Sequence, residues 1–283
     1  MTRSPRYAAN CTFLFTERPL LDRPRAARDA GFDTIELWWP FASATPGDRE
    51  LDELAESIRD SGVRLIGLNF FAGDLSGADA GVVSLPGREQ EFRDNVDLAV
   101  AFGERVGVRG FNALYGNRVD GVAPERQDEL AVENLSYAAA AAARIGATVL
   151  VEPLSGPKPY PLRTVSDVAA VVTGLRAAGH PNVGMLLDVF HLAMNGEDVE
   201  VAIRREISLI SHVQVADAPG RGEPGTGRLP LPDLLGLLGE LGYDGWTALE
   251  FVPSGGDTLR ALEWLPRADR GAGSNERDER NAR

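Results

Sequence analysis

Acidic side chains stand at the ends of several short apolar runs in the second half of the chain. Glu152 ends the run TVLV, Asp188 ends VGMLL, Glu250 ends WTAL, and Gln214 lies in a fourth run, HVQV. A single acid at a strand end is most often exposed or caps a helix. Three acids meeting in one buried place need a cation, because buried carboxylates must be paired, protonated or metal-bound. With oxygen ligands from all four residues, the pattern predicts one divalent metal, and Mg or Mn is favoured.

Four further polar residues follow these runs in predicted loops and are candidates for substrate binding. His191, Arg221, Glu223 and Lys158 could hydrogen-bond substrate oxygens, and a guanidinium can grip a carboxylate through two hydrogen bonds. The alternatives stay open, since a loop histidine satisfied by backbone, a solvated loop ion pair and a surface lysine are the plainer interpretations. His212 lies two residues before Gln214 on the same run, which predicts a packed group below it.

The runs that carry these residues alternate with helix-period segments, as in repeated strand and helix units with a parallel sheet. The predicted strands are 7–12, 34–38, 64–69, 108–113, 148–152, 183–188, 211–215 and 245–250. Helical segments are predicted at 51–61, 89–106, 126–145, 165–178 and 231–241. Eight units favour an α/β fold of the (β/α)8 TIM barrel type over an open sheet, and no glycine-rich phosphate motif follows the first strand. Active sites of such barrels lie at the C-terminal ends of the strands.

Length and composition agree with one catalytic barrel domain. The chain has 283 residues, and we expect the barrel to span 1–266 and a flexible polar tail to span 267–283. The net charge of −13 disfavours nucleic acid and anionic membranes as partners. Cys11 is the sole cysteine and no run resembles a signal peptide or membrane span, so we expect a cytoplasmic protein.

The motifs at the strand ends resemble those of the hydroxypyruvate isomerase family, within the xylose-isomerase-like barrels that include 2-oxo-tetronate isomerases. The stretches that carry the resemblance are LPGREQEFR at 85–93, VEPLS at 151–155, LDVFH at 187–191, HVQVADAPGRGEPGTG at 212–227 and GYDGW at 242–246. The likeness extends over nearly the whole chain up to about residue 265. It is most specific between residues 214 and 227.

The resemblance implies that Glu152, Asp188, Gln214 and Glu250 ligate the metal, and that Glu152 and Glu250 also exchange protons with substrate. Such an enzyme moves a carbonyl between adjacent carbons through an enediolate, which a metal would stabilise as a Lewis acid. A metal-assisted hydride shift stays open. The chain departs from the family where Val252 replaces a usual lysine and Asn112 a frequent histidine, so the sequence does not single out one substrate.

Our leading hypothesis is an aldose-ketose type isomerase of hydroxypyruvate, tartronate semialdehyde or a 2-oxo-tetronate. The first alternative is a ketose 3-epimerase or another sugar isomerase on the same metal site. A nucleic-acid enzyme on this barrel would need more histidine ligands and a basic groove, whereas the chain has three histidines. A catalytically silent binding protein is a third alternative. A homo-oligomer is an open expectation.

Overall fold

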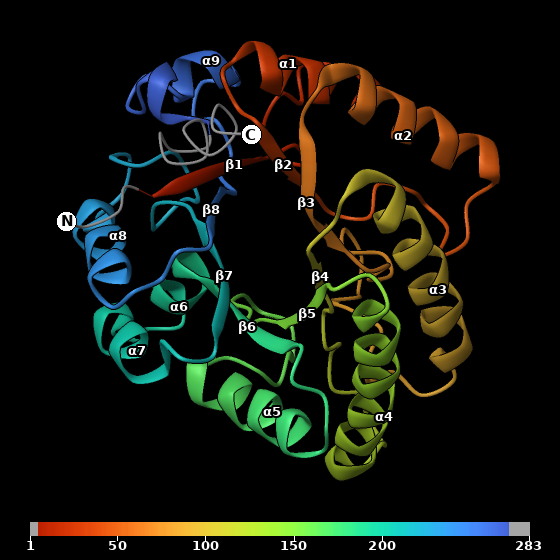
Figure 1. Ribbon diagram of the computed structural model, residues 1–283. Helices are drawn as coiled ribbons and strands as arrows, with labels where there is room; N and C mark the ends of the chain where they lie inside the picture. Colours follow the sequence, from red (N-terminus) through yellow and green to blue (C-terminus); the bar gives the residue numbers. More distant parts are fainter. Residues whose placement is uncertain (1–4, 272–283) are drawn as a thin grey trace.

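The computed structural model describes residues 5–271, which form a closed barrel of eight parallel strands surrounded by helices (Figure 1). The strands are β1 (Arg6–Asn10), β2 (Thr34–Leu37), β3 (Arg64–Asn69), β4 (Gly110–Asn112), β5 (Thr148–Val151), β6 (Val183–Asp188), β7 (Ile210–Val215) and β8 (Trp246–Leu249). Each strand pairs with its neighbours in sequence, and β8 pairs with β1. The predicted single-domain TIM barrel is therefore confirmed.

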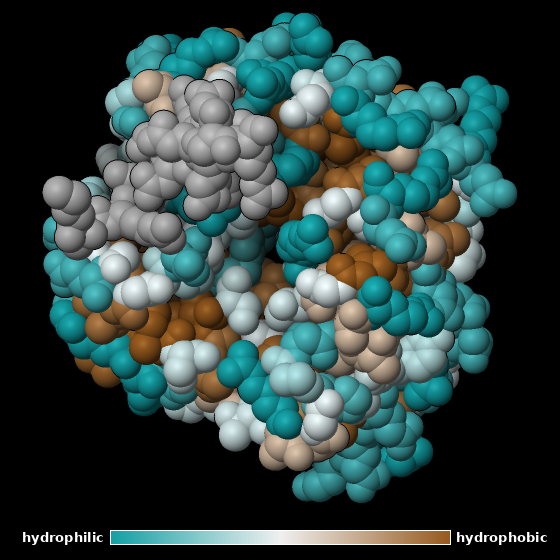
Figure 2. All heavy atoms as spheres, viewed as in Figure 1, coloured by the Kyte–Doolittle hydropathy of each residue, from teal (hydrophilic) through white to brown (hydrophobic). Residues whose placement is uncertain are grey.

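Helices cover the outside of the barrel in the order of the chain (Figure 1). They are α1 (Arg23–Asp29), α2 (Asp48–Ser61), α3 (Glu89–Val106), α4 (Pro124–Ala143), α5 (Val165–Ala177), α6 (Val189–Met194), α7 (Val199–Glu206), α8 (Leu231–Glu240) and α9 (Thr258–Ala261), with 3-10 turns η1 (Leu20–Asp22) and η2 (Arg267–Asp269). Helix α2 buries Leu51, Leu54, Ala55 and Ile58 at helical spacing against the barrel. In the same view, Figure 2 shows mainly hydrophilic residues over the outer helices and a narrow hollow at the centre.

The strand register brings predicted site residues of neighbouring strands together at the C-terminal end of the barrel. Asp188 of β6 pairs with Gln214 of β7, and Gln214 pairs in turn with Ala248 of β8. One step nearer the amino-terminal ends, Leu186 pairs with His212. Because side chains alternate along a strand, the residues two positions apart share the interior face. Asp188 and Gln214 thus lie side by side near the C-terminal ends of their strands, with Leu186 and His212 below them.

Most predicted elements coincide with the observed ones, but three short helices were not predicted. Strands β3 and β6 and helix α3 have the predicted bounds, while no helix was predicted at α6, α7 or α9. Each of these three has eight residues or fewer, too short for a clear helical period. Helix α6 matters most, because it starts directly after Asp188 and places His191 over the end of the barrel.

The ordered fold continues past the predicted domain boundary at residue 266. Residues 267–269 form η2, and Arg270 is buried. Its guanidinium donates hydrogen bonds to the backbone oxygens of Ala30, Leu262 and Leu265, which ties this end of the chain to α1 and to the turn after α9. Residues 267–271 therefore belong to the barrel, and the rest of the predicted tail, 272–283, lies outside the described residues. Between residues 5 and 271, no helix is both long and apolar enough to cross a membrane.

Candidate active site

The four predicted metal ligands all lie buried at the ends of β5 to β8. Glu152 is 5% exposed, Asp188 1%, Gln214 2% and Glu250 3%. Glu152 and Glu250 directly follow the last residues of β5 and β8, and Glu250 N–H donates to Val215 O, which continues the pairing of β7 with β8. Three carboxyl groups and one carboxamide are thus removed from bulk water in a single layer, and each requires a partner.

The two carboxylate oxygens of Asp188 have different contacts, one with helix α6 and the other with the interior of the barrel. Oδ1 caps helix α6 by accepting hydrogen bonds from Phe190 N at 2.8 Å and His191 N at 3.2 Å. Oδ2 faces inward, 3.7 Å from Arg221 Nη2 and 3.7 Å from His191 Nε2. The helix cap therefore fixes the carboxylate and leaves one oxygen available for chemistry.

The two carboxylate oxygens of Glu250 also have different partners. Its Oε2 accepts a hydrogen bond from Asn10 Nδ2 at 2.7 Å and a longer one from Trp38 Nε1 at 3.4 Å. Its Oε1 pairs with Arg221 Nη2. Since the same guanidinium nitrogen also approaches Asp188, the Arg221 side chain lies between two of the predicted metal ligands.

Arg221 is supported by aromatic rings and by the loop that carries it. Its guanidinium carbon lies 4.7 Å from the ring centre of Phe13 and 5.2 Å from that of Phe190, both within cation–π range. Its backbone has the left-handed φ of 56°, which is uncommon for a residue with a side chain. The loop is fastened by Asp217, which accepts hydrogen bonds from the backbone N–H groups of Ala218, Gly225 and Leu229. The loop therefore presents the guanidinium to the buried acids.

His191 reaches the site with a defined tautomer. Its Nδ1 lies 3.1 Å from the backbone N–H of Ser155. Because a backbone N–H can only donate a hydrogen bond, Nδ1 must be the acceptor. The ring proton is consequently on Nε2, the nitrogen that faces Asp188. Burial lowers the pKa of His191 and favours the neutral ring. His191 is thus arranged as a neutral hydrogen-bond donor at the site.

Two buried carboxyl groups have strongly raised pKa values. Burial, with the negative charge of Asp188 as a second cause, raises the pKa of Glu152 to about 8, although a hydrogen bond with the Asn112 side chain opposes the shift. Burial also raises the pKa of Glu250 well above its usual range, while the Arg221 guanidinium opposes that shift. Carboxyl groups with pKa values near or above neutrality are suited to carry and return protons.

Two site residues from the first strands were not predicted. Asn10 at the end of β1 donates from Nδ2 to both Glu36 Oε1, at 2.8 Å, and Glu250. Glu36 in β2 also accepts a hydrogen bond from Gln214 Nε2 at 2.7 Å and contacts His212 Nε2 at 2.8 Å. The signal was present, because an acid inside the apolar run of residues 34–37 points to the interior. The prediction from sequence rests on acids at the ends of runs, whereas Glu36 lies inside one.

Lys158 and Glu223 make their polar contacts outside the cluster of acids. Lys158 Nζ donates to the backbone oxygens of Leu75, at 3.1 Å, and Asp79, at 2.5 Å, and so joins the loop after β5 to the loop after β3. Glu223 accepts from Ser254 N at 3.0 Å and Ser254 Oγ at 2.5 Å, which joins the loops after β7 and β8. The structure places both residues at contacts between loops, and their binding of substrate stays a prediction.

The donor set fits a hard divalent cation in its chemistry, but it is not a ready-made metal site as it stands. Within residues 5–271, no group of three or more His, Cys, Asp or Glu side chains is arranged to hold a metal ion. The guanidinium of Arg221 supplies a positive charge between Asp188 and Glu250 instead. Gln214 donates from Nε2 to Glu36, so its Oε1 is the atom left to accept or ligate. The residues therefore fit a divalent ion in type, provided that Arg221 moves.

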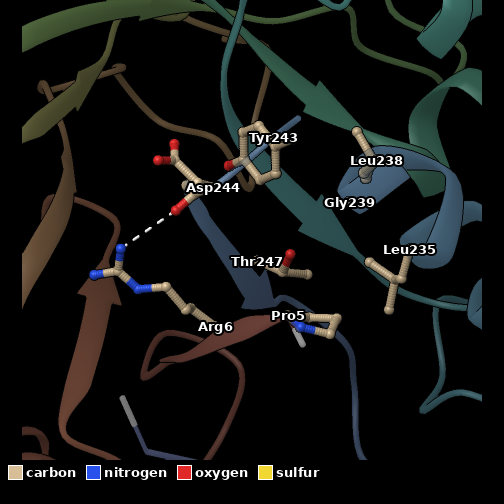
Figure 3. Close-up of a pocket in the computed structure, with 9 residues that line it drawn as sticks. Pro5, Arg6, Leu235, Leu238, Gly239, Tyr243, Asp244 and Thr247 are labelled. Carbon is tan, nitrogen blue, oxygen red and sulfur yellow. Dashed lines mark hydrogen bonds between the residues drawn. The ribbon is translucent and has the colours of Figure 1, made fainter. Parts of the chain in front are cut away.

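A separate pocket lies at the opposite end of the barrel, where β1 and β8 begin (Figure 3). It is lined by residues that include Pro5, Thr247 and Tyr243, and Arg6 Nη1 donates to Asp244 O at 3.2 Å across it. Its volume of about 20 Å³ can hold a water molecule and nothing larger. This pocket is therefore too small for a substrate, and active sites of TIM barrels lie at the other end, where the strands finish.

Comparison with known proteins shows the family to which this chain is similar. The family described as "Xylose isomerase-like TIM barrel" matches residues 24–268. A protein from Streptomyces coelicolor named "Putative hydroxypyruvate isomerase" is 51% identical over 94% of this chain and 98% of its own. The "2-oxo-tetronate isomerase" of Cupriavidus necator is 33% identical over 92% of this chain and 97% of its own. A crystal structure described as "AP endonuclease, family 2" from Brucella melitensis is 34% identical, with a TM-score of 0.83 over 92% of this chain and 98% of that one.

Proposed function

Because the chain belongs to the xylose isomerase-like TIM barrel family and is an isomerase related to hydroxypyruvate isomerases, we propose that its substrate is hydroxypyruvate, tartronate semialdehyde or a 2-oxo-tetronate. The observation that carries the proposal is the pair of buried carboxyl groups with raised pKa values, Glu152 and Glu250, beside one guanidinium. This pair suits the transfer of a proton between adjacent carbons of one small molecule.

The reaction moves a carbonyl group to the neighbouring carbon. A carboxylate removes the C–H proton of the hydroxyl-bearing carbon, and a carboxylic acid gives a proton to the former carbonyl carbon. The hydroxyl proton passes to the former carbonyl oxygen, so atoms and charges balance. We assign the two carbon-directed transfers to Glu152 and Glu250. His191, held as the Nε2–H tautomer, donates a hydrogen bond to an oxygen of the enediolate between the two transfers.

We assign the binding of one divalent ion, Mg or Mn, to Glu152, Asp188, Gln214 and Glu250. When bound, such an ion supplies positive charge that stabilises the enediolate as a Lewis acid. Metal analysis of the purified protein tests this assignment directly. A protein that retains no divalent ion, and whose turnover resists chelation and is not raised by added Mg or Mn, would remove the metal from the proposal.

Arg221 supports an acid as the substrate rather than a neutral sugar. Its guanidinium lies against the rings of Phe13 and Phe190 at the layer of acids, where it can reach a carboxylate of a bound molecule. A ketose epimerase has no substrate carboxylate to pair with it. A panel of hydroxypyruvate, tartronate semialdehyde, 2-oxo-tetronates and ketoses, with identification of products, distinguishes the two activities.

Solvent isotope exchange tests the proton-transfer step. In D2O the protein is expected to introduce deuterium at carbon into hydroxypyruvate or another acid of the panel, as measured by NMR. Glu152→Gln and Glu250→Gln should each lower this exchange by at least about 100-fold, because proton transfer by a positioned side chain contributes about 10²–10⁴-fold. Glu129→Gln, on the exposed face of α4, is the matched control and should exchange normally. Normal exchange in Glu152→Gln would refute the assignment.

Nucleic acid is the weaker alternative, although the Brucella melitensis structure is described as an endonuclease. A net charge of −13 gives no long-range attraction for phosphate backbones. A filter-binding assay with duplex DNA containing an abasic site is expected to show no salt-sensitive retention. Tight retention that falls steeply with salt would favour the endonuclease activity over the isomerase.

A further inference from the structure

We propose that Glu36 is a positioning residue for the isomerase, which fixes the Gln214 carboxamide with its oxygen toward the acids and, through Asn10, fixes the carboxylate of Glu250. This inference rests on the proposed function for its kinetic readout. Glu36 lies within β2. In the described hydrogen bonds and ion pairs it contacts Gln214, His212 and Asn10, but neither Arg221 nor Asp188.

The first part of the argument is the orientation of Gln214. Glu36 is 3% exposed, and its Oε1 lies 2.7 Å from Gln214 Nε2. The amide nitrogen is the donor of this hydrogen bond and the Glu36 carboxyl oxygen accepts it, so the NH2 group of Gln214 faces Glu36. Gln214 Oε1 is then directed to the other side. Without this acceptor, the two ends of the carboxamide have similar shapes, and the donor end could face the acids instead.

The second part is a chain of hydrogen bonds from Glu36 to Glu250. Asn10 Nδ2 has two hydrogens, and its two acceptors are Glu36 Oε1, at 2.8 Å, and Glu250 Oε2, at 2.7 Å. Asn10 Oδ1 accepts from Thr12 N at 2.9 Å, so the amide cannot turn over without losing three contacts. The chain holds Glu250 Oε2 and leaves Oε1 facing Arg221.

The surrounding backbone makes room for the Glu36 side chain. The pairing of β2 with β3 shifts register between Ile35 and Glu36, as in a β-bulge, a feature that re-aims side chains at barrel rims. On β3, a Cβ atom at Gly67 would lie 3.0 Å from Glu36 Oε2 and 3.1 Å from Glu36 Cβ. The second carboxylate oxygen is also occupied, because Oε2 lies 2.8 Å from His212 Nε2. Glu36 is thus confined to one conformation.

The test compares four proteins: wild type, Glu36→Met, Gln214→Glu and the double variant. Methionine has similar length but accepts no strong hydrogen bond, so Glu36→Met should lower kcat at least about tenfold with a smaller change in KM. Gln214→Glu in the wild type places a second carboxyl group against that of Glu36, and the loss of the amide donor should also lower kcat. In the Glu36→Met background the same change should raise kcat several-fold, because a carboxylate has two equivalent oxygens and needs no orientation. If Gln214→Glu lowers kcat equally in both backgrounds, Glu36 acts only in packing and the proposal is wrong.

A second pair of variants keeps the proposal testable if Glu36→Met does not fold. Glu36→Gln can donate an N–H to a carboxylate at position 214, so Glu36→Gln/Gln214→Glu should exceed Gln214→Glu alone in kcat at least about tenfold. Equal activity of these two proteins would contradict the contact on which the proposal depends.

A readout without turnover separates this proposal from the proposed function. In wild type the Gln214 side-chain NH2 protons, assigned by their loss in Gln214→Glu, should exchange slowly with solvent in NMR spectra. They should exchange at least tenfold faster in Glu36→Met, because methionine offers no strong acceptor to the amide. A wild type inactive on every acid with slow exchange refutes the isomerase substrate alone, whereas fast exchange in wild type refutes the positioning role.

Discussion

Replacing Glu152 by Gln should stabilise the metal-free protein, and the gain should grow as the pH rises. The cause is the raised pKa of Glu152, about 8 in the fold against 4.5 ordinarily, which comes from burial first and from Asp188 second. Between these pH values the unfolded chain has released the proton and the folded chain still holds it. Folding then takes up a proton, so stability falls with rising pH in this window and levels off above pH 8. Glutamine has no proton to release.

The magnitude follows from the width of that window. A shift from 4.5 to about 8 corresponds to an upper limit of about 5 kcal/mol, since one pKa unit equals about 1.4 kcal/mol. Relaxation of a buried site reduces this figure, and we expect about 2 kcal/mol or more. For a chain of this length, about 1 kcal/mol changes Tm by about 2 °C. Most of this gain arises between pH 5 and pH 8, so the Tm advantage of Glu152→Gln should grow by about 4–7 °C over that range.

Thermal melting after chelation, followed by circular dichroism at half-unit steps of pH, measures this difference. Glu129→Gln serves as the control, because Glu129 is 65% exposed and lies on α4, away from the site. An excess of Mn should narrow the gap by stabilising wild type, since a ligand that binds only the folded state raises its stability. A Tm difference that is constant with pH, or that shrinks as the pH rises, would show that Glu152 is ionised in the fold and would refute the reasoning.

Three further predictions concern neighbouring parts of the molecule. Arg221→Met should bind Mn at least about tenfold more tightly in titration calorimetry, because no guanidinium competes for Glu250, while KM for a keto acid rises; weaker binding would contradict the competition. Gly67→Ala should lower Tm and kcat together, since the added carbon presses on Glu36, and unchanged values would show that the strand shifts freely. Cys11 is buried and burial raises the pKa of its thiol, so it should react with a thiol reagent only on unfolding; rapid reaction in the native protein would contradict this.

The barrel and the acids of its second half could be predicted from sequence because the relevant signals are local. Each of Glu152, Asp188 and Glu250 follows a run of apolar residues that can only be a buried strand, and parallel strands of a barrel end on one face. Glycines that follow helices are a further local signal, and Gly62 and Gly146, after α2 and α4, adopt positive φ. The number and direction of the strands followed from this repetition.

The hydrogen-bond network could not be predicted in the same way because its contacts are distant in sequence. Glu36 reaches Gln214 across 178 positions and Asn10 reaches Glu250 across 240. The residues next to Glu36 in the sequence do not reveal whether its carboxyl group will find hydrogen-bond donors inside the barrel. Only closure of β8 against β1 brings the first and last strands into contact. The partners of Lys158 and Glu223 escaped prediction for a related reason, since loop positions depend on neighbouring loops.

Charge balance explains why Arg221 lies where a cation would bind. Four carboxyl groups share the layer, those of Glu36, Glu152, Asp188 and Glu250, and burial keeps Glu152 protonated up to a pH of about 8. Among these groups, the Arg221 guanidinium is the positive charge that pairs with Asp188 and Glu250, at the place to which we assign the divalent ion. Such an ion would take the place of the guanidinium at Glu250. The loop that carries Arg221, which is fastened by hydrogen bonds to Asp217, would still keep the guanidinium at the mouth of the barrel. A substrate carboxylate is the group that the released Arg221 would then pair with, so under the proposed function the binding of the ion and the selection of an acidic substrate would be coupled through one side chain.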